Sequence, residues 1–187
     1  MKKLSKTALA AIIIIVFLTA AFGVGLYFIL RENGPYRDLF ENNQIVIKVD
    51  GKEIGTYSVD ELTELAGMKE FNAVYKPSRK DPISRVYSGF ELKAVLEAAG
   101  VNMLEIKGVT FRGYDGFSKG LFPLSDLYKD NEIFVAVKYE GKDFIRAIKP
   151  SGSTYPEEDG GPFVVIKASD AFSNERMRGL VEINVKL

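Results

Sequence analysis

The chain of 187 residues carries 25 basic and 25 acidic residues and contains no histidine and no cysteine. Without imidazole or thiol groups it cannot build a Ser-His-Asp or Cys-His catalytic site, a structural zinc site, a c-type haem attachment or an iron–sulfur centre from its own side chains. Beyond Lys2, Lys3 and Lys6 the remaining 22 basic residues face 25 acidic ones, a net charge of −3, so nucleic acid is not expected as a partner.

A long apolar run opens the chain. Ala8 to Leu30 contains 23 residues without a charge, and as a helix of about 1.5 Å per residue it would cover about 35 Å, enough to cross a bilayer core of about 30 Å. Three lysines precede it, and Arg31 with Glu32 follows, which by the positive-inside rule predicts a single-pass signal anchor with a cytoplasmic N-terminus. A cleaved signal peptide is the alternative. The predicted organisation is a cytoplasmic tail at 1–7, a transmembrane helix at 8–30, a linker at 31–43 and an extracytoplasmic domain at 44–187.

The domain begins with a predicted hairpin followed by a helix. Gln44–Val49 alternates apolar and polar residues, and Asp50-Gly51 is a turn dipeptide that leads into a second strand at Lys52–Tyr57. Ser58-Val59-Asp60-Glu61 has the spacing of a capping box, and Gly67 is typical of the end of a helix. A second capping box is predicted at Ser88–Glu91, before a helix with an apolar face that ends at Gly100; this face consists of Leu92, Val95, Leu96 and Ala99.

The remaining elements are predicted mainly from alternation and from glycine and proline. Lys76–Arg85 has two prolines and no apolar period, which indicates a loop. The pattern further on predicts strands at Val109–Arg112, Ile133–Tyr139, Lys142–Ile148, Phe163–Ile166 and Val181–Val185, loops at Gly113–Gly120 and Pro150–Pro162, and a short segment at Ala171–Met177. The predicted fold class is α+β, with mixed but mostly antiparallel strands and short helices.

Four blocks in order resemble one family. Tyr87–Leu92, with the residues as far as Val101, is similar to a "Y-x-G-[VF]-x-L…L-L…A-G-V" segment. Val109–Phe117 is similar to a strand followed by a "D-G-[YF]" loop. Ile133–Gly141 is similar to an "L-A…N-G" hairpin. Gly160-Gly161-Pro162 is similar to the start of a "G-G-P-x-R-L" segment. The family is the molybdopterin-binding domain of sulfite-oxidase-type oxidoreductases, and the resemblance covers about residues 45–187. It implies that family's α+β fold, with a central pocket for a molybdenum–pyranopterin cofactor.

This chain departs from the family where the cofactor is held. The cysteine that ligates molybdenum is expected near Phe71–Lys76 and is missing, and thiolate is the soft ligand such a site needs. Val164 stands where the family has the arginine of "G-G-P-x-R", and the family's pterin-binding histidines are missing too. Molybdopterin is therefore possible by resemblance only, and no bound cofactor is expected.

The candidate ligand-binding residues lie around one glycine-rich loop. Arg112, Tyr114, Asp115 and Phe117 flank or occupy this loop, and the resemblance adds Gly161. The alternative is that Asp115-Gly116 is simply a turn. A second open question concerns the basic residues Arg79, Lys80 and Arg85 beside Tyr75 and Tyr87, which form either a basic, aromatic-edged mouth for an anion or a solvated loop face.

No catalytic residue and no metal site is predicted, although the acidic loop Glu157–Asp159 leaves weak calcium binding open as an alternative. The function expected from the sequence is a membrane-anchored, extracytoplasmic binding or interaction module on a molybdopterin-oxidoreductase-like fold. Besides the membrane, its expected partner is an anionic small molecule or a membrane-associated protein. The alternative is a molybdopterin-dependent oxidoreductase or redox subunit that binds the cofactor without cysteine, so the sequence leaves open whether the protein is an enzyme.

Overall fold

The computed structural model describes residues 6–76, 81–121, 123–144 and 160–187, and within these ranges the side chains of residues 14–25 and of residues from 34 onward. The chain divides into two compact units, Met1–Pro35 and Tyr36–Leu187. Helix α1 (Lys6–Glu41) contains Pro35, which has no N–H to donate to the carbonyl four residues earlier. Residues 31–41, which the sequence assigns to a linker, are part of this helix, and its last residues from Tyr36 onward belong to the second unit.

The transmembrane helix predicted at residues 8–30 is contradicted. Among the described residues, no helix is both long enough and apolar enough to cross a bilayer. The prediction of a membrane-spanning signal anchor is therefore corrected.

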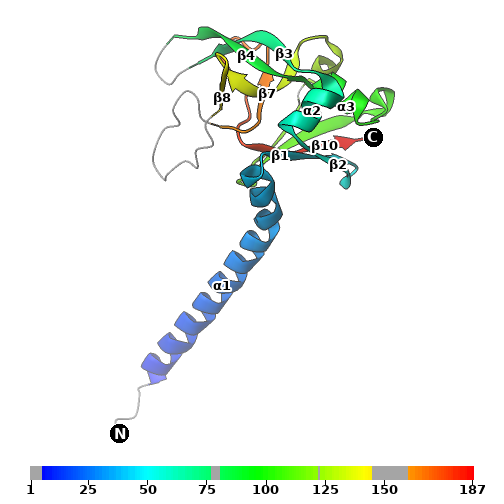
Figure 1. The fold of residues 1–187 in the computed structure, drawn as a ribbon. Coiled ribbons are helices and arrows are strands. Elements are labelled where there is room, and N and C mark those ends of the chain that lie inside the picture. The colour runs from blue at the N-terminus through cyan, green and yellow to red at the C-terminus, as the bar shows by residue number, and fades with distance from the viewer. Residues whose placement is uncertain (1–5, 77–80, 122, 145–159) are drawn as a thin grey trace. The chain divides into compact units, whose positions relative to one another are not determined.

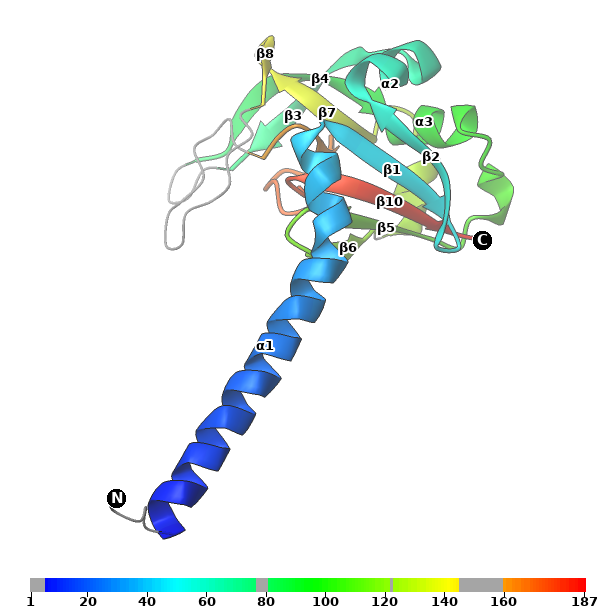
Figure 2. The same cartoon turned by 60° about the horizontal axis from the view of Figure 1, so that its bottom comes forward.

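The described residues of the second unit form two β-sheets. Sheet A has the strand order β2-β1-β10-β5-β6, which can be followed from strand to strand in Figure 2. Strands β1 and β10 are parallel, with Val46 beside Glu182, and all other neighbours in this sheet are antiparallel. The strands are β1 (Gln44–Val49), β2 (Lys52–Ser58), β5 (Gly108–Gly113), β6 (Ser118–Gly120) and β10 (Leu180–Lys186).

Sheet B is antiparallel throughout. Its order is β3-β4-β7-β8, and β9 pairs with β7 as well. Figure 1 shows β3, β4 and β7 beside one another. The strands are β3 (Lys69–Tyr75), β4 (Ile83–Glu91), β7 (Ile133–Tyr139), β8 (Lys142–Asp143) and β9 (Val164–Lys167).

The first hairpin and the first domain helix form as the sequence predicts. Asp50 and Gly51 both adopt positive φ (48° and 78°), the conformation of a tight turn whose twist suits a hairpin. Helix α2 (Val59–Ala66) begins with a complete capping box: the Ser58 hydroxyl accepts the Glu61 N–H, and the Glu61 carboxylate accepts the Ser58 N–H at 2.7 Å. These reciprocal bonds satisfy two N–H groups that would otherwise lack partners at a helix start.

The second predicted capping box is wrong. Ser88–Glu91 belong to strand β4, and helix α3 (Leu92–Ala98) starts directly after it without a side-chain cap. Gly89 explains the difference: a Cβ there would lie 2.4 Å from the Val135 carbonyl oxygen, because β4 passes very close to β7 at an irregularity in the pairing. A glycine can therefore mark a place where two strands approach closely, and here its neighbours happen to match the sequence pattern of a helix start. The apolar face predicted for α3 is confirmed, with Leu92, Val95 and Leu96 fully buried.

Strand β3, whose buried residues Phe71, Ala73 and Tyr75 alternate with others, was not predicted. Nor was the start of β4, where Ile83 is exposed and the basic Arg85 is buried. Two short 3₁₀ turns, Met103–Glu105 and Leu124–Tyr128, complete the regular structure. Of the strand predicted at Lys142–Ile148, only Lys142 and Asp143 are described as strand; residues 145–159, with most of the predicted loop at Pro150–Pro162 and the acidic residues Glu157–Asp159, lie outside the described residues. The α+β class with mixed, mostly antiparallel strands is confirmed.

The main hydrophobic core joins the two sheets and the helices. It contains buried side chains from β1, β5 and β10 of sheet A, from β7 and β9 of sheet B, and from α2 and α3. A second cluster includes Phe71, Tyr87, Phe134 and Phe144, with Phe71 stacked on Phe134 at 3.8 Å between ring centroids. This aromatic cluster matters for function because Tyr87 extends from it to the candidate site.

Candidate functional site

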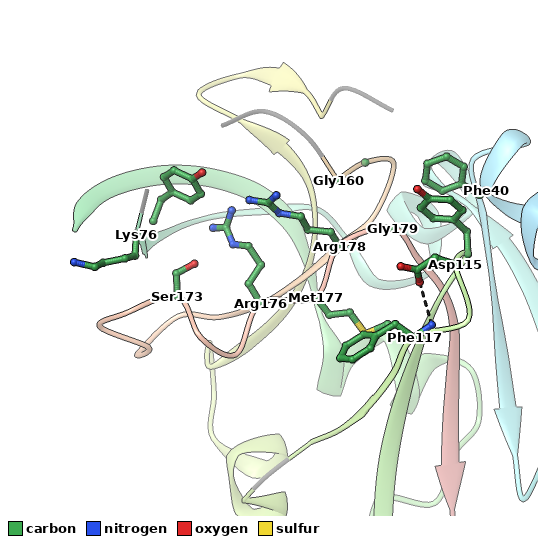
Figure 3. Close-up of a pocket in the computed structure, with 13 residues that line it drawn as sticks. Phe40, Lys76, Asp115, Phe117, Gly160, Ser173, Arg176, Met177, Arg178 and Gly179 are labelled. Carbon is green, nitrogen blue, oxygen red and sulfur yellow. Dashed lines mark hydrogen bonds between the residues drawn. The ribbon is translucent and has the colours of Figure 1, made fainter. Parts of the chain in front are cut away.

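One pocket of the second unit gathers basic, aromatic and glycine residues from segments far apart in sequence (Figure 3). Its volume is about 340 Å³. The end of β3, the loop after β5, the residues before β9 and the segment before β10 all contribute to it. The lining residues used below are Phe40, Tyr75, Lys76, Tyr114, Asp115, Phe117, Gly160, Gly161, Arg176 and Arg178, with Gly179 beside them.

Glycines allow the walls of the pocket to approach one another. A Cβ on Gly179, which has a φ of +61°, would lie 2.6 Å from the Tyr114 ring, and a Cβ on Gly160, with a φ of +116°, would lie 2.6 Å from Cγ of Arg178. The Gly179 N–H donates to the Gly160 carbonyl at 2.7 Å, and the Tyr114 N–H donates to the Gly179 carbonyl at 3.0 Å. The arginine and tyrosine side chains therefore lie directly against backbone, in positions that larger residues would block.

Two aromatic rings close one side of the site. Phe40, near the end of α1, is buried and stacks on Tyr114 with 4.1 Å between ring centroids and an interplanar angle of 24°. Phe117 lines the same pocket but is 58% exposed. An exposed phenyl ring at the edge of a pocket offers apolar surface to a ligand.

Arg176 is held at the other side by aromatic groups. Its Nη2 donates to the Tyr87 hydroxyl at 2.7 Å, and its guanidinium carbon lies 5.0 Å from the centroid of the Tyr87 ring and 5.1 Å from that of Tyr75. Contacts of this kind contribute about 0.5–2 kcal/mol each, depending on desolvation. They fix the planar group in one orientation without neutralising its charge.

The charge of Arg176 has no carboxylate partner among the described residues, and its Nε atom is buried without a hydrogen-bond acceptor there. Burying a donor without an acceptor costs free energy unless something else satisfies it. Figure 3 shows Arg178 and Arg176 both turned toward the same part of the pocket, with Lys76 on that side as well.

A neighbouring arginine repeats the arrangement. Arg85, which is 8% exposed, places its guanidinium carbon 5.1 Å from the Tyr75 ring centroid and 4.4 Å from that of Tyr139. Tyr75 therefore contacts two guanidinium groups, those of Arg85 and Arg176. Of the two interpretations of the basic residues near Tyr75 and Tyr87, the solvated loop face does not hold for Arg85, which is buried, but Arg85 does not line the pocket either. Arg79 and Lys80 lie outside the described residues.

The buried acid elsewhere in the domain is, by contrast, matched by lysines. Asp126 is 1% exposed, accepts from Lys129 Nζ at 2.6 Å and is paired with Lys167. These hydrogen bonds from Lys129 and Lys167 hold the pKa of the Asp126 carboxyl below its usual range, and the bond to Asp126 raises the pKa of Lys167. Such closed pairs of buried charges are structural.

The structure brings together most of the residues named from sequence. Tyr114, Asp115, Phe117 and Gly161 all line the pocket. Asp115 also makes the turn that was its alternative interpretation, because its Oδ1 accepts the Phe117 N–H at 3.0 Å. Gly161 contributes backbone only, since a Cβ there would lie 2.7 Å from Phe144.

Arg112 lies elsewhere. Its guanidinium carbon stacks 4.3 Å above the Tyr36 ring, in a polar cluster where the Tyr36 hydroxyl donates to Glu182 at 2.9 Å and Lys48 Nζ donates to the same carboxylate at 2.5 Å. Arg112 is not among the residues that line the pocket. The strand register explains this placement, because Arg112 lies opposite Glu182 in the pairing of β5 with β10.

Arg176, Arg178 and Lys76 were not predicted as site residues from the sequence. One signal was available, since Arg176-Met177-Arg178 precedes a predicted strand, and in an extended segment residues two apart point to the same side. The buried Met177 between them is consistent with this alternation. That Tyr75 and Tyr87 would receive these arginines depends on long-range packing that no local pattern contains.

The described residues do not fit a protein-ligated molybdopterin. The chain has no cysteine to bind the metal, and Val164, at the position of the family's arginine, is fully buried in the aromatic cluster rather than lining the pocket. No family model matches the chain, and a search of the curated proteins found no match. The resemblance to sulfite-oxidase-type domains thus stays a prediction, and function has to be argued from the pocket.

Proposed function

We propose that the unit Tyr36–Leu187 is a non-catalytic binding module that captures the anionic group of a small molecule in the pocket around Arg176. A guanidinium group presents a planar set of donors that matches the two oxygens of a carboxylate or phosphate. Arg178 and Lys76 add positive charge on the same side. The volume of about 340 Å³ is at the lower end of the range for small-molecule sites.

One observation carries the proposal. Arg176 is oriented by the Tyr87 hydroxyl and by two tyrosine rings, none of which cancels its charge, and its Nε is buried without an acceptor among the described residues. An arginine kept for packing alone would be expected to pair with a carboxylate, as the buried charges around Asp126 do. An anion supplied by a ligand would satisfy both requirements.

The lining residues support binding better than catalysis. The chain offers no imidazole or thiol, and the one carboxylate that lines the pocket among the residues that the structure describes, Asp115, is engaged in the turn of its own loop. Cations and aromatic rings hold and orient charge, but a proton-transfer or nucleophilic mechanism needs a group positioned to act on a substrate. Capture of an anion is therefore the activity that these side chains support.

The test is isothermal titration of the full chain with inorganic phosphate, sulfate and acetate. The wild type should bind at least one of these anions saturably, more weakly as salt is raised. Arg176→Lys keeps the charge but loses the planar pair of donors, so it should weaken binding about tenfold, roughly 1.4 kcal/mol. Tyr87→Phe, which removes only the orienting hydroxyl, should weaken binding by a smaller factor.

Arg37→Lys is the matched control, because Arg37 is an exposed arginine paired with Glu41 on the surface of α1. It should bind like the wild type. Equal affinity in the wild type and Arg176→Lys, with an unchanged melting temperature, would contradict the proposal. So would the absence of saturable binding to all three anions.

A further inference from the structure

We infer that the ligand of this pocket has two chemically different ends: an anionic group for the arginines, and an aromatic ring carrying a hydrogen-bond donor for the opposite side. This inference rests on the proposed function and specifies its ligand class. The class is that of amino-substituted aromatic or heteroaromatic compounds with a phosphate or carboxylate group.

The two sides of the pocket differ in charge. Figure 3 shows Lys76, Arg176 and the guanidinium of Arg178 on one side, and Asp115, Phe117 and Phe40 on the other. Asp115 makes no ion pair with these basic groups in the described part of the chain; its only hydrogen bond there is from its own loop, at Oδ1. An inorganic oxyanion would occupy the basic side and leave the other side without a partner.

The side opposite the arginines is suited to a flat ring. Phe117 exposes 58% of its surface there, and the stacked pair Phe40 and Tyr114 gives a rigid wall that a ligand does not have to order. Aromatic rings stack with one another at a gain of about 0.5–1.5 kcal/mol beyond simple burial. A rigid wall lowers the entropic cost of binding as well.

Asp115 determines which hydrogen-bonding groups the ring of the ligand can carry. A carboxylate accepts hydrogen bonds and does not donate them, so it favours a ring that carries an amino group over one that carries only acceptors. The Asp115 carboxylate also repels a second anionic group, which excludes a ligand that is negatively charged at both ends. Because Phe117 follows Asp115 by two residues and the two are joined by a 3.0 Å hydrogen bond, the ring contact and the donor contact are fixed relative to each other.

The experiment compares four probes on the full chain by isothermal titration: inorganic phosphate, ribose 5-phosphate, adenosine 5′-monophosphate, and purine riboside 5′-monophosphate, which lacks the amino group. We expect the adenosine compound to bind about tenfold or more tightly than ribose 5-phosphate, and several-fold more tightly than the purine riboside compound. Asp115→Asn should remove the second difference and Phe117→Ala most of the first.

The outcomes separate the two proposals. Binding of phosphate that depends on Arg176, with no preference for adenosine 5′-monophosphate over ribose 5-phosphate, would overturn this inference and leave the proposed function standing. If the wild type bound none of the four probes, both the inference and the proposed function would be overturned. Phe172→Ala is the control variant for removal of an exposed ring, because Phe172 is also 58% exposed but does not line the pocket; it should change none of the four affinities.

Discussion

Asp126 is the most deeply buried charged side chain among the described residues. We expect Asp126→Asn to lower the free energy of unfolding by about 2 kcal/mol at pH 7, because an amide cannot satisfy both Lys129 and Lys167 as the carboxylate does. Chemical denaturation measures the change. Asp130→Asn is the control, since this carboxylate is 81% exposed and pairs with Lys93 at the surface; its effect on stability should be much smaller than that of Asp126→Asn.

The same residue predicts a pH dependence. The pKa of Asp126 is lowered in the folded state, from an ordinary value of 3.8, by its hydrogen bonds with Lys129 and Lys167. The stability that it contributes is therefore complete above that ordinary value and is lost as the pH falls below it, through the folded-state pKa. The difference in unfolding free energy between wild type and Asp126→Asn should be constant from pH 7 to about pH 5 and should shrink below about pH 4. A difference that grows on acidification would contradict this assignment.

At the level of single residues, the part of the site that lies on one loop could be predicted from the sequence. Tyr114, Asp115 and Phe117 share one loop with Gly113 and Gly116, and glycine with aspartate marks a loop whatever the rest of the chain does. The arginines were missed because their role depends on Tyr75 and Tyr87, which reach Arg176 only after two sheets have packed. The position of Arg112 outside the pocket was not predicted for the same reason, because the Tyr36 ring on which it stacks lies far away in sequence.

At the level of elements, Gly89 is the most restrictive position in strand β4. Gly89→Ala should destabilise the protein by about 3 kcal/mol or more, because the new methyl group would lie 2.4 Å from the Val135 carbonyl oxygen and 2.6 Å from Ala136 Cα, both backbone atoms. The melting temperature and the denaturation midpoint both report the change.

Gly108→Ala is the matched control in strand β5. Its added methyl group would meet nothing closer than Lys186 Cβ at 4.0 Å, so it should change stability by less than about 1 kcal/mol. If both substitutions are tolerated equally, the close pairing of β4 with β7 is not as described.

Elements with strong local signals were predicted well. The Asp50-Gly51 and Glu140-Gly141 turns, the capping box at Ser58 and the alternating strand Ile133–Tyr139 are each specified within a few residues. Strand β3 was not predicted, because the polar residues Lys69, Glu70 and Asn72 leave only a short apolar pattern, mainly on one face of the strand. The start predicted for α3 was wrong, because Ser88-Gly89 belongs to strand β4 and not to the first turn of a helix.

At the scale of the whole second unit, a single core should give a single unfolding transition. Leu96 of α3 is fully buried in the cluster that contains side chains from both sheets. Leu96→Ala should therefore cost about 2–5 kcal/mol and shift the entire transition rather than loosen α3 alone. Circular dichroism at a helix-sensitive wavelength and tyrosine fluorescence should report the same lowered midpoint.

Leu104→Ala provides the comparison for Leu96→Ala, because Leu104 is 93% exposed. It should leave the midpoint unchanged within error. Two separate transitions in either variant would mean that the sheets are stabilised independently, which the composition of the core argues against.

The place of β10 has a consequence for biosynthesis. This strand lies between β1 and β5, so the middle of sheet A is supplied by residues 180–186 while its neighbour β1 is made far earlier. A nascent chain on the ribosome can form the hairpin of β1 and β2 early, but the other edge of β1 has no permanent neighbour until residues 180–186 have been made. Pairings so distant in sequence form slowly, and during that interval this edge is where a chaperone would be most useful.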